Sequence, residues 1–146
     1  MSHVATVDVE VKDLESLDLA CQRLGLELVR HQLSYKWFGK HIGDYPLPEG
    51  FAVHELGRCD HAIRIPGKPD AYEIGVVRRR DGRPGFMLLW DFFAGGYGLE
   101  KIVGHECQAL RQHYAAAVAT REARRKGFIV QETKLGNGQI QLRMTR

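Results

Sequence analysis

Residues 72–93 read YEIGVVRRRDGRPGFMLLWDFF, and this stretch decides the fold. From Tyr72 to Arg78 apolar side chains fall on one face, as in a half-buried strand. Phe86–Phe93 is an almost continuous apolar run, which favours a buried strand. Asp81-Gly82 separates the two segments, and glycine readily adopts the positive φ angles of tight turns. The stretch therefore predicts a β-hairpin with a buried return strand.

A second hairpin is predicted near the C-terminus. Asn137-Gly138 is a residue pair that favours a tight turn with positive φ angles. Apolar residues flank the pair at alternating positions: Phe128 and Val130 before it, and Ile140, Leu142 and Met144 after it. We expect two strands to pair across this turn.

The N-terminal segment predicts a strand, a helix and another strand. Valines alternate with charged residues over Val7–Val11, as in a half-buried strand. Asp13 can cap a helix that ends at Gly25. The helix carries apolar residues at helical spacing: Leu14, Leu17, Ala20, Cys21 and Leu24. Leu26–Tyr35 is rich in strand-forming residues and is expected to run back beside the first strand.

A longer helix is predicted before the C-terminal hairpin. Its apolar stripe comprises Leu110, Tyr114, Ala117 and Val118. Cations suit the C-terminal end of a helix, and Arg124-Arg125-Lys126 followed by Gly127 marks that end.

These elements predict the fold class. We expect one α+β domain, residues 1–146, with an antiparallel sheet that contains both hairpins and packs on two main helices. Residues 62–146 are expected to form a continuous sheet, in a split or ferredoxin-like arrangement. At 146 residues, 44% of them hydrophobic, the chain is long enough to bury a sizeable core.

Composition predicts a cytoplasmic setting. The three cysteines are odd in number and widely spaced, which is a poor disulfide framework and favours a reducing compartment. The N-terminus lacks a basic and apolar leader, and no apolar run approaches the ~18 residues of a membrane span.

Residues 36–61 predict an irregular but ordered excursion. Glycines and prolines interrupt this segment, yet it holds enough apolar side chains to pack. Loops of this length often carry function. Trp37, Tyr45 and Phe51 are its candidate residues for binding a protein partner.

Histidines and cysteines predict a possible metal site. His54, Cys59 and His61 occur close together, and His105 and Cys107 form a second pair. Zinc accepts these ligand types. Neither group has the Cys-x2-Cys spacing of a zinc ribbon or finger, so the alternative is two buried cysteines with surface histidines.

Carboxylates could serve as general bases if the fold desolvates them. The candidates are Asp44, Asp60, Asp91 and Glu106. Asp91 follows a buried strand, and His105 is a second candidate catalytic residue. The alternative for Asp91 is a structural role, capping a neighbouring turn or pairing with an arginine. The chain has no Gly-x-Ser-x-Gly elbow, Walker loop or His-Glu-x-x-His helix.

Basic residues cluster twice. Arg78, Arg79 and Arg80 precede the first turn, with Arg83 after it, and Arg124 and Arg125 end the long helix, following Arg121. Such clusters can contact phosphates of a nucleic acid. The net charge is only +3, which is low for a dedicated nucleic-acid binder, and solvated helix and turn faces are the alternative.

Five short motifs occur in one order along the chain: Met1-Ser2-His3, Tyr72-x-Ile74-Gly75, Trp90-Asp91, Leu110–Ala115 and Ala123–Phe128. Together they resemble the domain of unknown function 1257 family, which includes hypothetical chloroplast reading frame 35 proteins of plastids and cyanobacteria. Gly43–Pro48 is similar to the bacterial or phage branch. The resemblance implies no catalytic residue or cofactor. It implies an accessory role beside an AAA-type ATPase.

The leading hypothesis is a non-enzymatic adaptor that binds a macromolecular partner through residues 36–61. One alternative is a small metal-binding protein or enzyme that uses the His, Cys and Asp candidates. The other is a weak nucleic-acid-binding protein that uses the two basic clusters.

Overall fold

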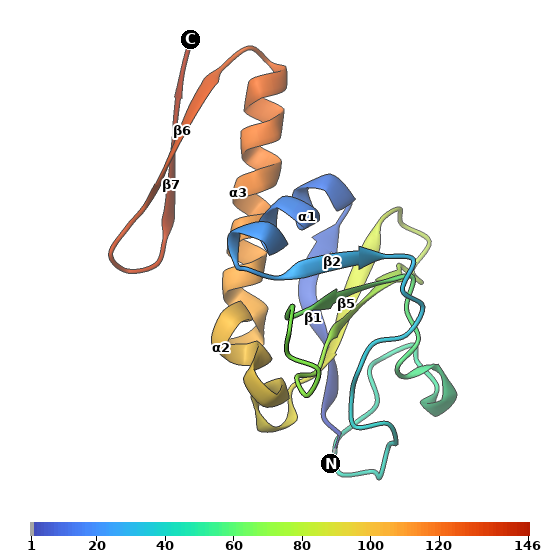
Figure 1. Cartoon of the computed structure of the whole chain (residues 1–146). Helices are drawn as coiled ribbons and strands as arrows, with labels where there is room; N and C mark the ends of the chain where they lie inside the picture. The colour runs from blue at the N-terminus through green and yellow to red at the C-terminus, as the bar shows by residue number, and fades with distance from the viewer. Residues whose placement is uncertain (1) are drawn as a thin grey trace.

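The computed structural model describes residues 2–146 (Figure 1). Ten main elements follow one another: β1 (Val4–Val11), α1 (Leu14–Arg23), β2 (Glu27–Arg30), β3 (His61–Arg64), β4 (Ile74–Arg78), β5 (Phe86–Asp91), α2 (Leu99–Val103), α3 (Gln108–Arg125), β6 (Ile129–Lys134) and β7 (Ile140–Thr145). Three short 3-10 turns complete them: η1 (Val53–Glu55), η2 (Phe93–Gly98) and η3 (His105–Cys107). The fold is α+β, as predicted.

The main sheet has five antiparallel strands in the order β1-β5-β4-β3-β2. The hairpin predicted around Asp81-Gly82 is confirmed, because Ile74 pairs with Trp90 and Arg78 pairs with Phe86. β5 is an interior strand that lies between β4 and β1, and its residues Leu88–Asp91 are buried.

The position predicted for the second strand was wrong. β2 ends at Arg30, and it lies at the opposite edge of the sheet from β1. The physical reason is the chain of hairpins from β2 to β5, because each strand pairs with the next and the last one returns beside β1. Three strands separate β1 from β2, so the ferredoxin-like order does not form.

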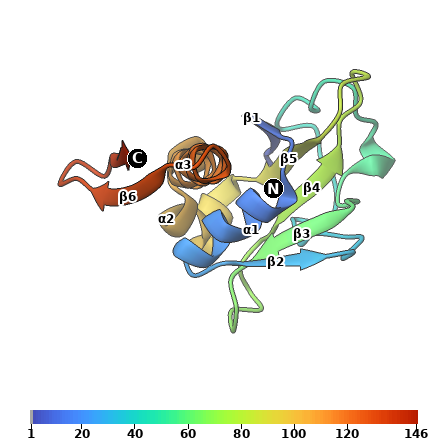
Figure 2. The same cartoon turned by 90° about the horizontal axis from the view of Figure 1, so that it is seen from above.

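Helices α1 and α3 cover one face of this sheet (Figure 2). Asp13 caps α1 as predicted, since its carboxylate accepts the N–H of Glu15 at 3.0 Å. The stripe on α3 is confirmed at Leu110, Tyr114 and Ala117, which are buried, but Val118 is exposed. No helix within residues 2–146 has the length and hydrophobicity to cross a membrane.

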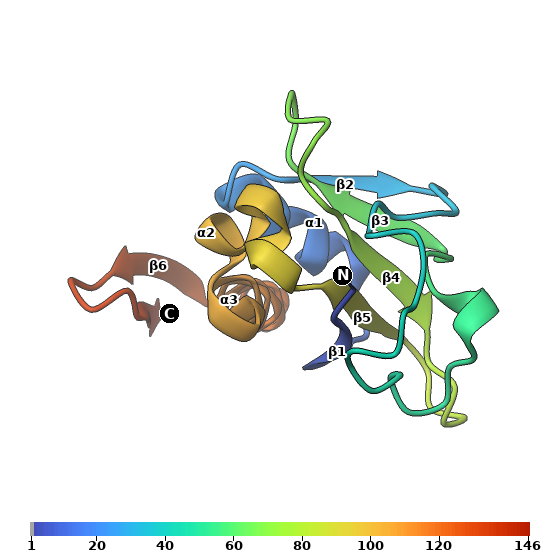
Figure 3. The ribbon, with the colours of Figure 1, turned by 90° about the horizontal axis from the view of Figure 1, so that it is seen from below.

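The C-terminal hairpin β6–β7 forms, but as a separate two-stranded sheet. The prediction of one continuous sheet from residue 62 onward was wrong, because α3 carries the chain to the far side of the helices (Figure 3). The turn is longer than a two-residue turn. Leu135 N donates to Gln139 O at 2.7 Å, and Gly138 supplies the positive φ of 85°.

The second face of the main sheet is covered by the irregular segment between β2 and β3. Tyr35, Phe51 and Leu56 pack there against sheet residues such as Ala62 and Leu89. The Tyr35 ring lies on Gly75 of β4, where a side chain would collide with it. The chain therefore has four layers: hairpin, helices, sheet and loop.

Candidate functional site

The strand β1 has one edge that no other strand occupies. It ends the sheet order, so among residues 2–146 only β5 pairs with it. Phe92 N donates to His3 O at 3.1 Å, so these two residues form a hydrogen-bonded pair of the ladder. In an antiparallel ladder such pairs alternate with pairs that are not hydrogen-bonded. Ala5 and Trp90 are therefore the next hydrogen-bonded pair, and the N–H and C=O of Ala5 point toward β5. Those of Thr6 point outward, away from β5. Thr6 thus offers a donor and an acceptor to a further strand.

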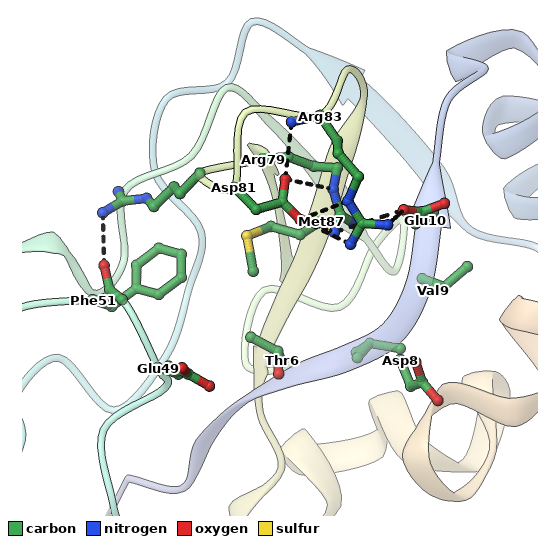
Figure 4. Close-up of a pocket in the computed structure, with 13 residues that line it drawn as sticks. Thr6, Asp8, Val9, Glu10, Glu49, Phe51, Arg79, Asp81, Arg83 and Met87 are labelled. Atoms are coloured by element: carbon green, nitrogen blue, oxygen red, sulfur yellow. Dashed lines mark hydrogen bonds and ion pairs between the residues drawn. The ribbon is translucent and has the colours of Figure 1, made fainter.

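A groove of about 760 Å³ lies beside this edge, next to the loop layer (Figure 4). Its lining comes from four parts of the chain. Thr6 and Asp8 belong to β1, and Met87 belongs to β5. Glu49 and Phe51 belong to the irregular segment, and arginines of the β4–β5 turn close the other side.

The arginines of the groove are held by carboxylates. Arg79 and Arg83 both pair with Asp81, with closest N–O distances of 2.5 and 2.9 Å, and Arg83 also reaches Glu10 at 2.5 Å (Figure 4). The hydrogen bonds of Arg79, and those of Arg83, hold the pKa of Asp81 below its usual range. This side of the groove is therefore a compensated network rather than an open cationic surface.

A second cavity of about 330 Å³ lies against the same part of β1. Three aromatic residues, Tyr45, Trp90 and Phe92, line it. Its ionisable lining residues come from β1, α2, η3 and the start of α3: Asp8, Glu100, His105, Glu106 and Arg111. Its volume suits one side chain or a small ligand, and apolar walls with a few polar groups are typical of binding sites.

Unusual backbone angles shape one wall of this cavity. Glu106 and Cys107 have φ angles of 52° and 56°, a region that L-residues other than Asn and Asp seldom adopt. Ala94 and Tyr97, in the preceding turn, also have positive φ. Strained residues persist only where the surrounding structure holds them, and they gather at functional sites. The strain thus marks the segment that presents Glu106 to the cavity.

No match was found. The chain was compared with protein-family models, curated proteins and solved structures, and none matches it. The resemblance to the domain of unknown function 1257 family stays a prediction from short motifs, so the function rests on the geometry of the site.

Asp91 is a structural anchor in this fold. Its side chain is fully buried and accepts three backbone N–H groups, from His3 at 2.9 Å, Phe38 at 3.1 Å and Phe93 at 3.1 Å. These donors belong to the N-terminus, the irregular segment and the turn after β5. Asp91 therefore has the structural, turn-capping role that was the alternative to catalysis. A general base would have to reach a substrate, and this carboxylate is fully buried.

The structure does not bring the predicted metal ligands together. No three His, Cys, Asp or Glu side chains converge in the described part of the chain. Cys59 is buried and donates to Gln32 O at 3.1 Å, and His54 and His105 are exposed. Burial raises the pKa of Cys59 and of Cys107 to about 12, so both thiols are protonated at neutral pH. The two His/Cys groups lie on different elements: His54 is in η1 and His61 in β3, whereas His105 and Cys107 are in η3.

The predicted partner-binding aromatic residues are less exposed than the hypothesis required. Phe51 is 7% exposed and belongs to the second core. Trp37 and Tyr45 are half-buried. The physical reason is that the loop layer must cover the second face of the sheet, so Phe51 and Trp37 pack inward, whereas Phe38 stays exposed. Of these three aromatic residues that were predicted to bind a partner, Tyr45 is the one that lines the second cavity.

The predicted nucleic-acid-binding arginines are mostly engaged. Arg79 pairs with Asp81, Arg80 with Glu55 at 2.6 Å, and Arg125 with Glu122 at 2.7 Å. Arg80 also lies over the Phe51 ring, at 4.0 Å from the centroid. Arg78 lies over Phe86 in the same way, at 5.5 Å. Arg124 is exposed at the end of α3. Carboxylates thus compensate three of the four arginines in the first cluster, whereas in the second Arg125 shares Glu122 with Lys126 and Arg124 forms no ion pair in the described part of the chain.

Sequence patterns missed the free edge of β1 and the cavity residues Glu100 and Arg111. Alternation over residues 4–11 predicts a strand, but no local signal says whether a strand is central or at an edge. Glu100 belongs to no motif, and the Leu110–Ala115 motif that contains Arg111 indicated no role for it. Each becomes a cavity residue only through the packing of α2 and α3 beside β1.

The burial of His61 predicts that the free energy of unfolding depends on pH. It is buried, and its Nδ1 accepts the N–H of His31 at 2.9 Å, which requires the neutral ring. Burial, and then the nearby His31, lower the pKa of His61. The unfolded histidine binds a proton below about pH 6.5, while the folded one resists it. Stability from this group is therefore complete above pH 6.5 and is lost as the pH falls.

Urea unfolding at pH 7.5 and pH 5.5 checks this expectation. The wild type should be less stable at pH 5.5, and His61→Asn, which keeps an acceptor but cannot titrate, should show a smaller difference between the two pH values. His113, whose pKa burial also lowers, should keep part of the dependence in the variant. An unchanged pH difference in His61→Asn would contradict the assignment.

Proposed function

We propose that this chain is a non-enzymatic adaptor that binds an extended segment of a protein partner at the free edge of β1. One observation carries the proposal. The edge residues Thr6, Val7 and Asp8 line both the groove and the second cavity.

Strand addition explains why two cavities flank one edge. Backbone hydrogen bonds to the edge provide affinity, and pockets for alternate side chains provide specificity. Successive side chains of a strand point to opposite faces of the sheet. A segment paired with β1 would therefore place one side chain toward the groove and the next toward the second cavity.

The regular part of the edge is short. The pairing of β1 with β5 shifts between Val7 and Val11, so residues 4–7 form the undistorted ladder. The partner segment is therefore about four to six residues long. The expectation of an AAA-type ATPase as partner, which the resemblance implies, is compatible with this proposal, because a flexible tail or loop of a large protein can supply such a segment.

Thr6→Pro tests the proposal. Proline removes the outward N–H of Thr6 but no hydrogen bond to β5, and proline is tolerated at edge strands in this position. Short peptides selected from a random library against the full chain should bind Thr6→Pro at least tenfold more weakly, since one backbone bond is lost and the proline ring blocks the edge. Thr6→Ala, which removes the same side chain but keeps the N–H, is the matched control and should bind these peptides more tightly than Thr6→Pro does.

Hydrogen exchange gives an independent measurement. The amide of Thr6 should exchange more slowly in the peptide complex than in the free chain, whereas the amide of Ala5, already bonded within the sheet, should change little. Equal affinity of Thr6→Pro and Thr6→Ala, with no protection of Thr6, would reject strand addition.

A further inference from the structure

We infer that the second cavity receives a basic side chain, lysine or arginine, from the partner segment. The inference rests on the proposed function and adds the chemistry of the partner. It uses the aromatic wall of the cavity, its excess of carboxylates and its position beside the edge.

The aromatic wall suits the apolar stem and the cation of such a side chain. The rings of Tyr45 and Phe92 are 5.1 Å apart in an edge-to-face arrangement, and both residues are half-buried. Trp90 lies 6.3 Å from Phe92 and is almost completely buried. Long basic side chains pack their methylene groups on apolar surface, and their cations are attracted by aromatic faces.

The charges of the cavity favour a cation. Three carboxylates, from Asp8, Glu100 and Glu106, line it, against one guanidinium, from Arg111. In the described part of the chain, Asp8 and Glu100 form no ion pair, and Glu106 approaches only His105, at 3.7 Å. Arg111 forms no ion pair with these carboxylates in the described part of the chain, and its Nε donates to the backbone carbonyl of Glu106 at 3.2 Å. The carboxylates therefore lack a cation that a partner would supply.

The groove on the other face lacks this property. Three arginines line it and pair with Asp81, Glu10 and Glu55, and of its lining carboxylates only Asp8 and Glu49 form no ion pair in the described part of the chain. A basic side chain is therefore expected at one register position of the partner segment and not at its neighbours. A basic residue at one position only would distinguish binding in the second cavity from nonspecific attraction between acidic and basic chains.

Peptide selection with matched variants tests the inference. Peptides selected from a random seven-residue library against the full chain should carry Lys or Arg at one common position. Replacing that residue by norleucine should lower the affinity for the wild type about tenfold, because a cation between aromatic and acidic groups is lost. In the double variant Glu100→Gln/Glu106→Gln the two peptides should bind almost equally. Glu49→Gln, in the groove, is the control and should keep the tenfold ratio.

The outcomes are distinguishable. Selected peptides without a common basic position, or a tenfold ratio that survives in Glu100→Gln/Glu106→Gln, would overturn the basic side chain. If Thr6→Pro still weakened the binding of such peptides, the proposed binding at the edge of β1 would stand, without a basic side chain in the second cavity. If Thr6→Pro had no effect, the proposed function itself would fail. A concentration-dependent dimer that Thr6→Pro converts to monomer, with no peptide binding, would assign the edge to a second copy of the chain and overturn the inference.

Discussion

Replacing Asp91 by alanine is expected to lower the free energy of unfolding by about 3–5 kcal/mol. The carboxylate is fully buried and accepts three backbone N–H groups. Hydrogen bonds to a charged group are stronger than neutral ones, and each donor left buried without a partner adds its desolvation cost. Because the donors lie on three segments, the loss should loosen the N-terminus, the loop layer and the turn after β5 together.

Urea unfolding measures this effect through the midpoint and slope of the transition. Asp91→Asn keeps the shape and part of the acceptor capacity, so it should be less destabilising than Asp91→Ala. Asp81→Asn is the control, because Asp81 is a solvent-exposed ion-pair residue whose replacement should destabilise the fold much less than Asp91→Ala does. Similar stabilities for Asp91→Ala and Asp81→Asn would contradict the anchoring role.

Replacing Gly75 by alanine is expected to lower the free energy of unfolding by about 2–3 kcal/mol. A Cβ at this position would lie 2.6 Å from Cε1 of Tyr35 and closer still to Cδ1. The Tyr35 ring is 3% exposed and packs in the second core, so it cannot move aside without opening that core. The effect is therefore one of overpacking between the sheet and the loop layer.

A double-mutant cycle identifies the cause. Tyr35→Ala removes the ring, and in that background Gly75→Ala should cost much less than in the wild type. Gly136→Ala is the control, since Gly136 has open space around it and an ordinary φ angle. If Gly75→Ala were equally costly with and without the Tyr35 ring, another contact would have to be responsible.

Local signals in the sequence predicted the elements well. The Asp81-Gly82 turn, the Asp13 cap and the stripe of α3 at Leu110 and Tyr114 all depend on residues a few positions apart. Their physics is local, since turns need positive φ angles and helices need a capping acceptor and an apolar stripe. Such features can be recognised without knowledge of the rest of the chain.

Strand order could not be predicted in the same way. Val4 pairs with Asp91, and no pattern near either residue indicates the other. The same is true of β2, whose composition predicts a strand but not the edge at which it lies. Pairing across such distances is decided by which arrangement lets the helices and the loop layer cover both faces of the sheet.

The candidate site shows the same division. Among the residues that the sequence singled out are Asp91, His105, Tyr45 and Phe51. Only the packing showed that Asp91 is an anchor and that Phe51 is buried. It also showed that Tyr45 and His105 line one cavity.

By itself, the sequence determined the α+β class, the two hairpins and the helix ends, because these follow from short-range backbone and side-chain preferences. The tertiary structure alone decided the strand order, the free edge of β1 and the two cavities beside it. The reason is that exposure, charge compensation and free hydrogen-bonding groups are properties of residues brought together from distant parts of the chain.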